Sequence, residues 1–196
     1  MKKRNGYYIQ LDNAAENMLR GANFLGCGHN GIVYLLEDNN KVIKIFKSKY
    51  VCRSEYNILQ RTSKSKYFPK IYSHGLYYIV RSYAEGERLD YYIKQNGLNE
   101  KVAKNIINLI KEFQKLKFTK LDIRCKDLYL CKDSSIKVID PKNNYSKYCN
   151  YPRHLMKGLD KLGVLDEFLE FIKEEYGEVY EDWNYKIKRY LCRGIK

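Results

Sequence analysis

The sequence LGCGHNGIVYLLEDNNKVIKIF, residues 25–46, decides how the first half of the chain is interpreted. Gly26, Gly28 and Gly31 form the pattern G-x-G-x-x-G, and an apolar run follows them. A polar turn then precedes an alternating strand that contains Lys44. The stretch is either a phosphate-binding hairpin or an ordinary β-hairpin that contains glycines, and G-x-G-x-x-G alone is too weak a pattern to decide.

The composition is that of a folded, basic protein. A chain of 196 residues is long enough for one domain, or for two small lobes that share a core, and 44% of its residues are hydrophobic. The 37 Lys and Arg exceed the 23 Asp and Glu, so the net charge is +14. This charge favours anionic partners such as nucleotide phosphates, nucleic acid or an acidic protein surface. The alternative is a solvated basic surface without a partner, since the lysines are spread along the chain.

The cysteines and the apolar segments predict a cytoplasmic protein. The six cysteines form no C-x-x-C pair and have no histidine at zinc-like spacing. The start MKKRNGYYIQ has no apolar stretch behind it, so we expect no signal peptide. No window approaches the roughly 18 apolar residues of a membrane helix. We therefore expect reduced thiols and no membrane partner.

The first half of the chain favours strands. NFLGCG and GIVYLLED predict two strands joined by the glycine turn, and KVIKIF predicts a third. YVCRSEYNILQR has helical spacing, with Glu55 in its middle. PKIYSHGLYYIVRSYAEG predicts two strands around the dipeptide HG.

The second half favours helices. ERLDYYIKQNG predicts a short helix that ends at Gly97. LNEKVAKNIINLIKEFQKLKF is the clearest helix, because its apolar residues recur at steps of three and four. LYLC and IKVID predict a hairpin around the turn KDSS, and the last 50 residues predict two packed helices.

Five charged residues stand in an order that suits phosphoryl transfer from ATP. That reaction needs positioning and positive charge around the triphosphate rather than covalent help from the protein. A strand lysine can reach the phosphates, a helical carboxylate can hold the lysine, and acidic groups can bind Mg²⁺. These residues are, in chain order, Lys44, Glu55, Asp122, Asp127 and Asp140. Each alone has an ordinary structural interpretation, such as a solvated helix residue or a turn former, and the joint order carries the prediction.

Residues 20–145 resemble the protein-kinase-like superfamily. LGCGHNGIVYLL is similar to its glycine-rich loop, KVIK to its V-A-I-K motif, and SEYNIL to the helix that donates a glutamate to the lysine. YIVRSYAEGERL is similar to the hinge that binds adenine. The resemblance implies that Glu55 pairs with the strand lysine, and it implies an ATP site made by Gly26, Gly28, Gly31, Val33, Lys44, Ser82 and Ala84.

The catalytic motifs of the superfamily have counterparts in the second half. LDIRCKDLYL resembles H-R-D-x-x-x-x-N, which implies that Asp122 is the catalytic base and that Arg124 stands where a phosphate-contacting lysine is common. VIDP resembles the strand that ends in the metal-binding aspartate of D-F-G. The resemblance therefore implies that Asp127 and Asp140 bind Mg²⁺ or Mn²⁺.

Several positions depart from the kinase motifs. Leu121 precedes the catalytic aspartate, an aspartate replaces the asparagine, D-F-G becomes D-P-K, and no A-P-E follows. In its size and in its LDIR and VIDP motifs, the chain most resembles small Ser/Thr kinase-like proteins of low-GC Gram-positive bacteria. In its reduced size it is also similar to the RIO-like kinases and to the small kinase of the KEOPS complex.

These observations predict an α+β, two-lobed protein-kinase-like fold in one domain, with a β-rich N-lobe (1–83) and a reduced α-helical C-lobe (84–196). The expected function is ATP-dependent phosphotransfer, by a minimal Ser/Thr protein kinase acting on an unknown protein substrate. Two alternatives remain open: a nucleotide-binding pseudokinase or ATPase that acts as an interaction module, and a kinase-like subunit that acts on RNA.

Overall fold

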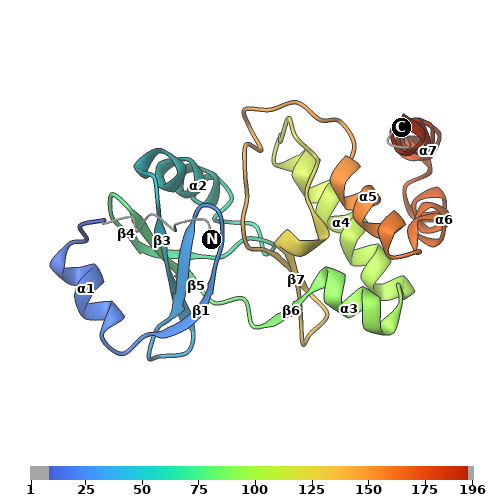
Figure 1. Cartoon of the computed structure of the whole chain (residues 1–196). Helices are drawn as coiled ribbons and strands as arrows, with labels where there is room; N and C mark the ends of the chain where they lie inside the picture. Colours follow the sequence, from blue (N-terminus) through green and yellow to red (C-terminus); the bar gives the residue numbers. More distant parts are fainter. Residues whose placement is uncertain (1–8, 194–196) are drawn as a thin grey trace, which may run out of the picture. The chain divides into compact units, whose positions relative to one another are not determined.

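The computed structural model describes residues 9–193, and it divides into two compact units with the boundary between Tyr83 and Ala84 (Figure 1). The first unit is built around a β-sheet, and the second is mainly helical with a small sheet. This mixed α+β composition, with the strands concentrated at the N-terminal side, is the one that the sequence predicts.

The first unit contains an antiparallel sheet of five strands in the order β1-β2-β3-β5-β4. The glycine turn joins the first two strands, and the backbone N–H of Gly28 donates to the carbonyl of Gly31 at 2.8 Å to close it. The strands are β1 (Asn23–Cys27), β2 (Gly31–Leu35), β3 (Lys41–Phe46), β4 (Ile71–His74) and β5 (Tyr78–Ser82).

Two helices belong to this unit, α1 (Asn13–Leu19) and α2 (Lys49–Arg61). Successive side chains of a strand point to opposite faces of the sheet. Ile43 therefore packs with Ala15 of α1, whereas its neighbour Lys44 meets Glu55 of α2. The alternation in KVIKIF thus separates the apolar packing under α1 from the charged pair beside α2.

Helix α1 is absent from the sequence-based prediction. It has only seven residues, so the helical repeat has too little length to be recognised. Its start carries a local signal, because the side chain of Asp12 accepts a hydrogen bond from the backbone N–H of Ala15 at 2.8 Å.

The second unit is centred on α4 (Glu100–Lys115), whose predicted apolar stripe is buried from Val102 to Phe113. Asn99 caps this helix by accepting from the N–H of Val102 at 2.9 Å. The other elements are α3 (Leu89–Asn96), the 3₁₀ turn η1 (Cys125–Asp127), α5 (Arg153–Lys161), α6 (Leu165–Glu175), α7 (Gly177–Arg193), and a sheet of β6 (Gly86–Arg88), β7 (Leu128–Cys131) and β8 (Ile136–Val138).

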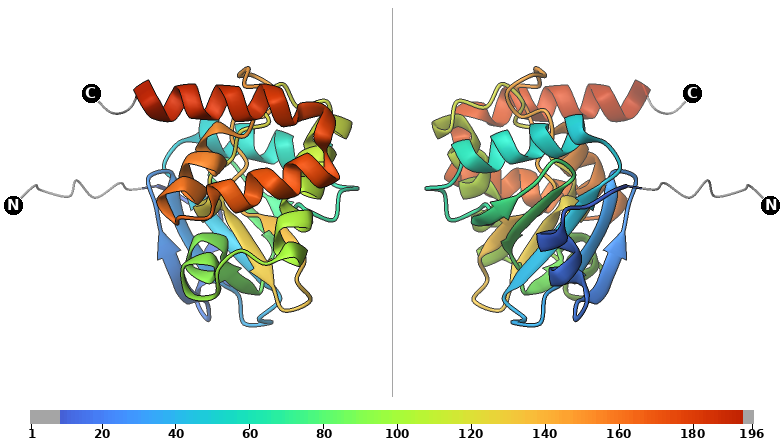
Figure 2. Two further views of the ribbon diagram at one scale, coloured as in Figure 1. Left: turned by 90° about the vertical axis from the view of Figure 1, so that its right-hand side faces the viewer. Right: turned by 90° about the vertical axis from the view of Figure 1, so that its left-hand side faces the viewer.

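Two details of the second unit differ from the prediction. Glu87 and Arg88, predicted to start the helix, instead pair with β7 together with Gly86, and the helix begins at Leu89. Within the described part of the last 50 residues there are three helices and not two, since α5 precedes α6 and α7, which lie side by side (Figure 2). Helix α5 spans nine residues, too few for the periodic signal that identified α4.

Between residues 9 and 193, no helix combines the length and apolarity that crossing a lipid bilayer requires. All six cysteines are free thiols. Cys27 and Cys192 are exposed, whereas Cys52 and Cys125 are buried.

The buried cysteines are predicted to resist alkylation. Burial raises the pKa of Cys52 to about 11 and that of Cys125 to about 12, and only the thiolate is a strong nucleophile. Iodoacetamide at mildly alkaline pH is expected to label Cys27 and Cys192 in the native protein, and to label Cys52 and Cys125 only after denaturation. Peptide mass spectrometry of native and denatured samples measures this, and fast native labelling of Cys125 would contradict the packing described here.

Candidate active site

A buried ion pair joins the strand lysine to the helical glutamate of the first unit. The ammonium of Lys44 lies 2.6 Å from Oε2 of Glu55, and the two side chains are 7% and 2% exposed. The same ammonium lies 4.8 Å from the centre of the Phe46 ring, which supplies an additional cation–π contact. The two residues that the sequence places 11 apart are therefore brought together in the way the kinase resemblance implies.

The glycine turn lies next to this lysine in the sheet. Gly26 of β1 pairs with Val33 of β2, and Val33 pairs with Lys44 of β3, so the three form a row across adjacent strands. An added Cβ at Gly26 or Gly28 would meet no atom within 4 Å, whereas one at Gly31 would lie 1.9 Å from the carbonyl oxygen of Ile45. Gly31 is thus required by strand packing, and Gly26 and Gly28 are free of that constraint.

The two predicted hinge residues lie on either side of the boundary between the units. Ser82 ends β5, where its backbone N–H donates to the carbonyl of Lys70 at 2.8 Å and its hydroxyl accepts from the N–H of Lys70 at 3.0 Å. Ala84 begins the second unit and is buried. The backbone N–H of Ser82 is therefore already engaged within the first unit.

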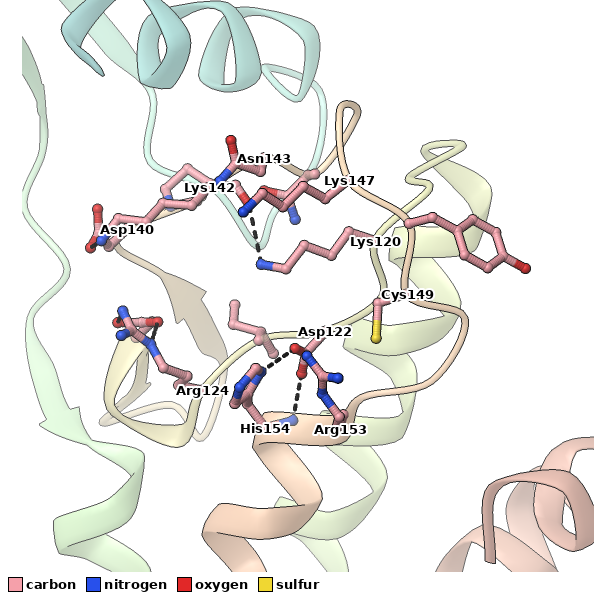
Figure 3. Close-up of a pocket in the computed structure, with 15 residues that line it drawn as sticks. Lys120, Asp122, Arg124, Asp140, Lys142, Asn143, Lys147, Cys149, Arg153 and His154 are labelled. Atoms are coloured by element: carbon pink, nitrogen blue, oxygen red, sulfur yellow. Dashed lines mark hydrogen bonds and ion pairs between the residues drawn. The ribbon is translucent and has the colours of Figure 1, made fainter. Parts of the chain in front are cut away.

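The other four predicted site residues line one pocket of about 330 Å³ within the second unit (Figure 3). Asp122 and Arg124 come from the segment between α4 and η1, Asp127 ends η1, and Asp140 follows β8. The β7–β8 hairpin brings the last two aspartates together, because the N–H of Ile139 donates to the carbonyl of Asp127 at 3.0 Å.

Both predicted metal ligands are paired with basic side chains. Asp127 accepts from Nε of Arg124 at 2.6 Å and from Nη2 at 2.9 Å, and Asp140 forms an ion pair with Lys142. Arg124 is therefore committed to Asp127 in this structure. Hydrogen bonding to Asp127 raises the pKa of Arg124, so the guanidinium stays protonated.

The ligand chemistry fits a magnesium ion. Carboxylate oxygens suit Mg²⁺, which is commonly held by one or two carboxylates together with substrate phosphates. Asp127 and Asp140 both line this pocket and supply two carboxylates. Residues 9–193 contain no cluster of three or more His, Cys, Asp or Glu side chains placed to hold a metal by themselves. Two carboxylates would leave the remaining positions of such an ion to water or to phosphate oxygens.

Asp122 is held by His154, a residue that the sequence analysis did not select. Its side chain is 2% exposed. Oδ1 accepts from the backbone N–H of His154 at 2.6 Å, and Oδ2 contacts Nδ1 of the His154 ring (Figure 3). His154 is one of three histidines in the chain and follows Pro152 at the start of α5, which was the signal available in the sequence.

A backbone bridge explains why residues 32 apart meet. Lys120 and Cys149 form an isolated parallel β-bridge. The N–H of Leu121 donates to the carbonyl of Cys149 at 2.8 Å, and the N–H of Cys149 donates to that of Thr119 at 2.9 Å. These bonds align the segment before Asp122 with the segment before α5, so the first turn of that helix meets the carboxylate.

Basic side chains complete the pocket. Lys120, Lys142, Lys147 and Arg153 line it together with the three aspartates. The ammonium of Lys120 donates to the carbonyl of Lys142 at 3.2 Å, and burial lowers the pKa of Lys120. Chemically, the pocket offers carboxylates for a cation, cations for an anion, and an imidazole next to a buried carboxylate.

Comparisons with known proteins give a likeness in structure but none in sequence. No protein-family model matches the chain, and no curated protein matches it. Among solved structures, 1303 chains match. One of them is the co-crystal structure of WbdD with the kinase inhibitor LY294002, which has a TM-score of 0.52 and 14% sequence identity to this chain.

The match to WbdD covers 85% of this chain and 41% of the WbdD chain, so this chain spans less than half of that protein's length. At 14% identity the likeness establishes the fold and nothing finer. The chain therefore has a kinase-like α+β fold, with a β-sheet unit at its N-terminal side and a helical unit at its C-terminal side.

Proposed function

We propose that the protein is an ATP-dependent phosphotransferase, a minimal Ser/Thr kinase that transfers the γ-phosphate to a protein hydroxyl. The buried pair of Lys44 and Glu55 on a kinase-like fold carries this proposal. Burying two charges costs desolvation energy that their attraction often does not recover, so such a pair is a poor device for stability alone. The pair is accounted for if Glu55 holds the ammonium of Lys44 in place to contact the phosphates of ATP.

The second unit supplies groups of the kind that the reaction needs. Asp127 and Asp140 would hold Mg²⁺ or Mn²⁺, whose charge would offset that of the triphosphate. The ATP contacts in the first unit would come from the glycine turn, Val33 and Lys44, and the hinge contacts from Ser82 and Ala84. The Ser/Thr specificity rests on the resemblance of the motifs.

The lining of the pocket favours an acceptor that carries negative charge near its hydroxyl. Lys120, Lys142 and Lys147 line it, and opposite charges guide encounter and orientation. Acidic protein segments therefore suit the pocket better than basic ones.

A second candidate function is a nucleotide-binding module without turnover. The pairing of Asp127 with Arg124 and of Asp140 with Lys142 favours it, because each basic group competes with a metal ion for the carboxylate. The two candidates differ in whether ATP displaces these contacts and is consumed.

Transfer of radiolabelled phosphate from ATP distinguishes them. With Mg²⁺ or Mn²⁺ and dephosphorylated casein as acceptor, the wild type is expected to incorporate label, and Asp140→Asn is expected to lose about a hundredfold of the rate, because one metal ligand is removed. Lys142→Met is the comparison variant, since it removes the competing cation and leaves the carboxylate; a loss confined to a higher KM for casein would report weaker acceptor binding and not loss of the metal ligand. Stabilisation of the wild type by ATP in a thermal shift assay, without any labelled product, would favour the binding module instead.

A further inference from the structure

The carboxylate of Asp122 is poorly placed to take a proton from a substrate. Its side chain is 2% exposed, and both of its oxygens are engaged by His154, one by the backbone N–H and one by the ring. A general base must come within hydrogen-bond reach of the proton that it removes. The role that the kinase resemblance implies for Asp122 therefore conflicts with its burial.

The imidazole of His154 has the access that Asp122 lacks. Its side chain is 43% exposed and lines the same pocket as Asp127 and Asp140 (Figure 3). A carboxylate can only accept a hydrogen bond, so the contact with Asp122 puts the proton of the neutral ring on Nδ1. Nε2 then carries the free lone pair, which makes it the basic nitrogen of the ring.

We propose that Nε2 of His154 is the proton acceptor of the phosphotransfer reaction, and that Asp122 is a positioning residue that fixes the tautomer and orientation of the ring. This assignment rests on the proposed phosphotransferase function. The acceptor hydroxyl gives its proton to Nε2 while its oxygen forms a bond to the γ-phosphorus. The bond from that phosphorus to the bridging oxygen breaks, and its electron pair leaves with ADP. The imidazolium is stabilised by Asp122 and later releases its proton to water.

A purely structural role for the contact makes a different prediction. Asp122 also satisfies an N–H in the first turn of α5, as a capping residue does. In that case His154 would matter only as a hydrogen-bond donor to Asp122. Asparagine separates the two roles, because its amide N–H can replace the Nδ1 donor while nothing replaces Nε2.

The test compares His154→Asn with His154→Ala in the full-length protein, using labelled ATP and dephosphorylated casein. His154→Asn is expected to keep its melting temperature and its stabilisation by ATP, and to lose about a hundredfold or more in kcat, the usual contribution of a general base. His154→Ala is expected to show the same loss in kcat and to regain part of the rate when free imidazole is added. Asp122→Asn is expected to bind ATP and to turn over slowly, since the amide favours the wrong ring tautomer.

The outcomes separate this inference from the proposed function. Activity of His154→Asn within about threefold of the wild type would overturn the role of Nε2 and leave the phosphotransferase function standing. Loss of activity in His154→Ala without any response to imidazole, together with active His154→Asn, would assign His154 to structural support alone. Absence of transfer by the wild type would overturn the proposed function, and this assignment with it.

Discussion

Replacing Lys44 with methionine is expected to abolish phosphotransfer and to lower the free energy of unfolding by about 3–5 kcal/mol. The loss of stability follows from burial, because Glu55 is 2% exposed and its charge would lose the ammonium at 2.6 Å. The loss of activity follows from the absence of a cation for the phosphates. Urea denaturation followed by circular dichroism measures the first effect, and labelled ATP measures the second.

The double variant Lys44→Met with Glu55→Leu separates the two effects. Exchanging a buried ion pair for apolar side chains of similar size is often neutral or stabilising, so this variant is expected to unfold within about 1 kcal/mol of the wild type. It should nevertheless remain inactive. If the double variant regained phosphotransfer, or if Lys44→Met alone kept it, the pair would have no part in the reaction and the proposed function would lose its main support.

Replacing Gly31 with alanine is expected to destabilise the first unit by about 3 kcal/mol or more. The added Cβ would lie 1.9 Å from the carbonyl oxygen of Ile45, a backbone atom of β3. This carbonyl cannot move away without disturbing the pairing of Gly31 with Phe46 and of Ile32 with Ile45. The midpoint of urea denaturation measures the effect.

Gly28→Ala is the matched control in the same turn. An added Cβ there meets no atom within 4 Å, and the φ of Gly28 lies outside the left-handed region, so stability should change by no more than about 0.5 kcal/mol. If the turn cradles phosphate, this variant still weakens the stabilisation by ATP in a thermal shift assay, because the side chain blocks close approach of the backbone. Equal stability of Gly31→Ala and the wild type would contradict the strand pairing described here.

The sequence predicts the elements whose apolar residues recur regularly. The stripe from Val102 to Phe113 identifies α4, and the alternation in KVIKIF identifies β3 and places Lys44 on one face of the sheet. Periodicity is a local property, since it records which face of an element is buried. By contrast, β6, α1 and α5 are not recognised from the sequence; they span three, seven and nine residues, so each offers few repeats.

The three glycines illustrate the same limit. In the sequence they form one motif, and one role for all of them is the natural interpretation. The structure divides them, because Gly31 is pressed against β3 while Gly26 and Gly28 are not. The distance to a neighbouring strand decides this, and that distance is not encoded in the spacing of the glycines.

The sequence by itself determined the fold class and the order of Lys44, Glu55, Asp122, Asp127 and Asp140 along the chain. Only the tertiary structure decided that His154 meets Asp122. The two residues lie 32 positions apart in segments without a repeat, and they meet because backbone bonds between Leu121 and Cys149 align those segments. Periodic patterns specify which faces are buried, whereas contacts between irregular segments depend on the path of the whole chain.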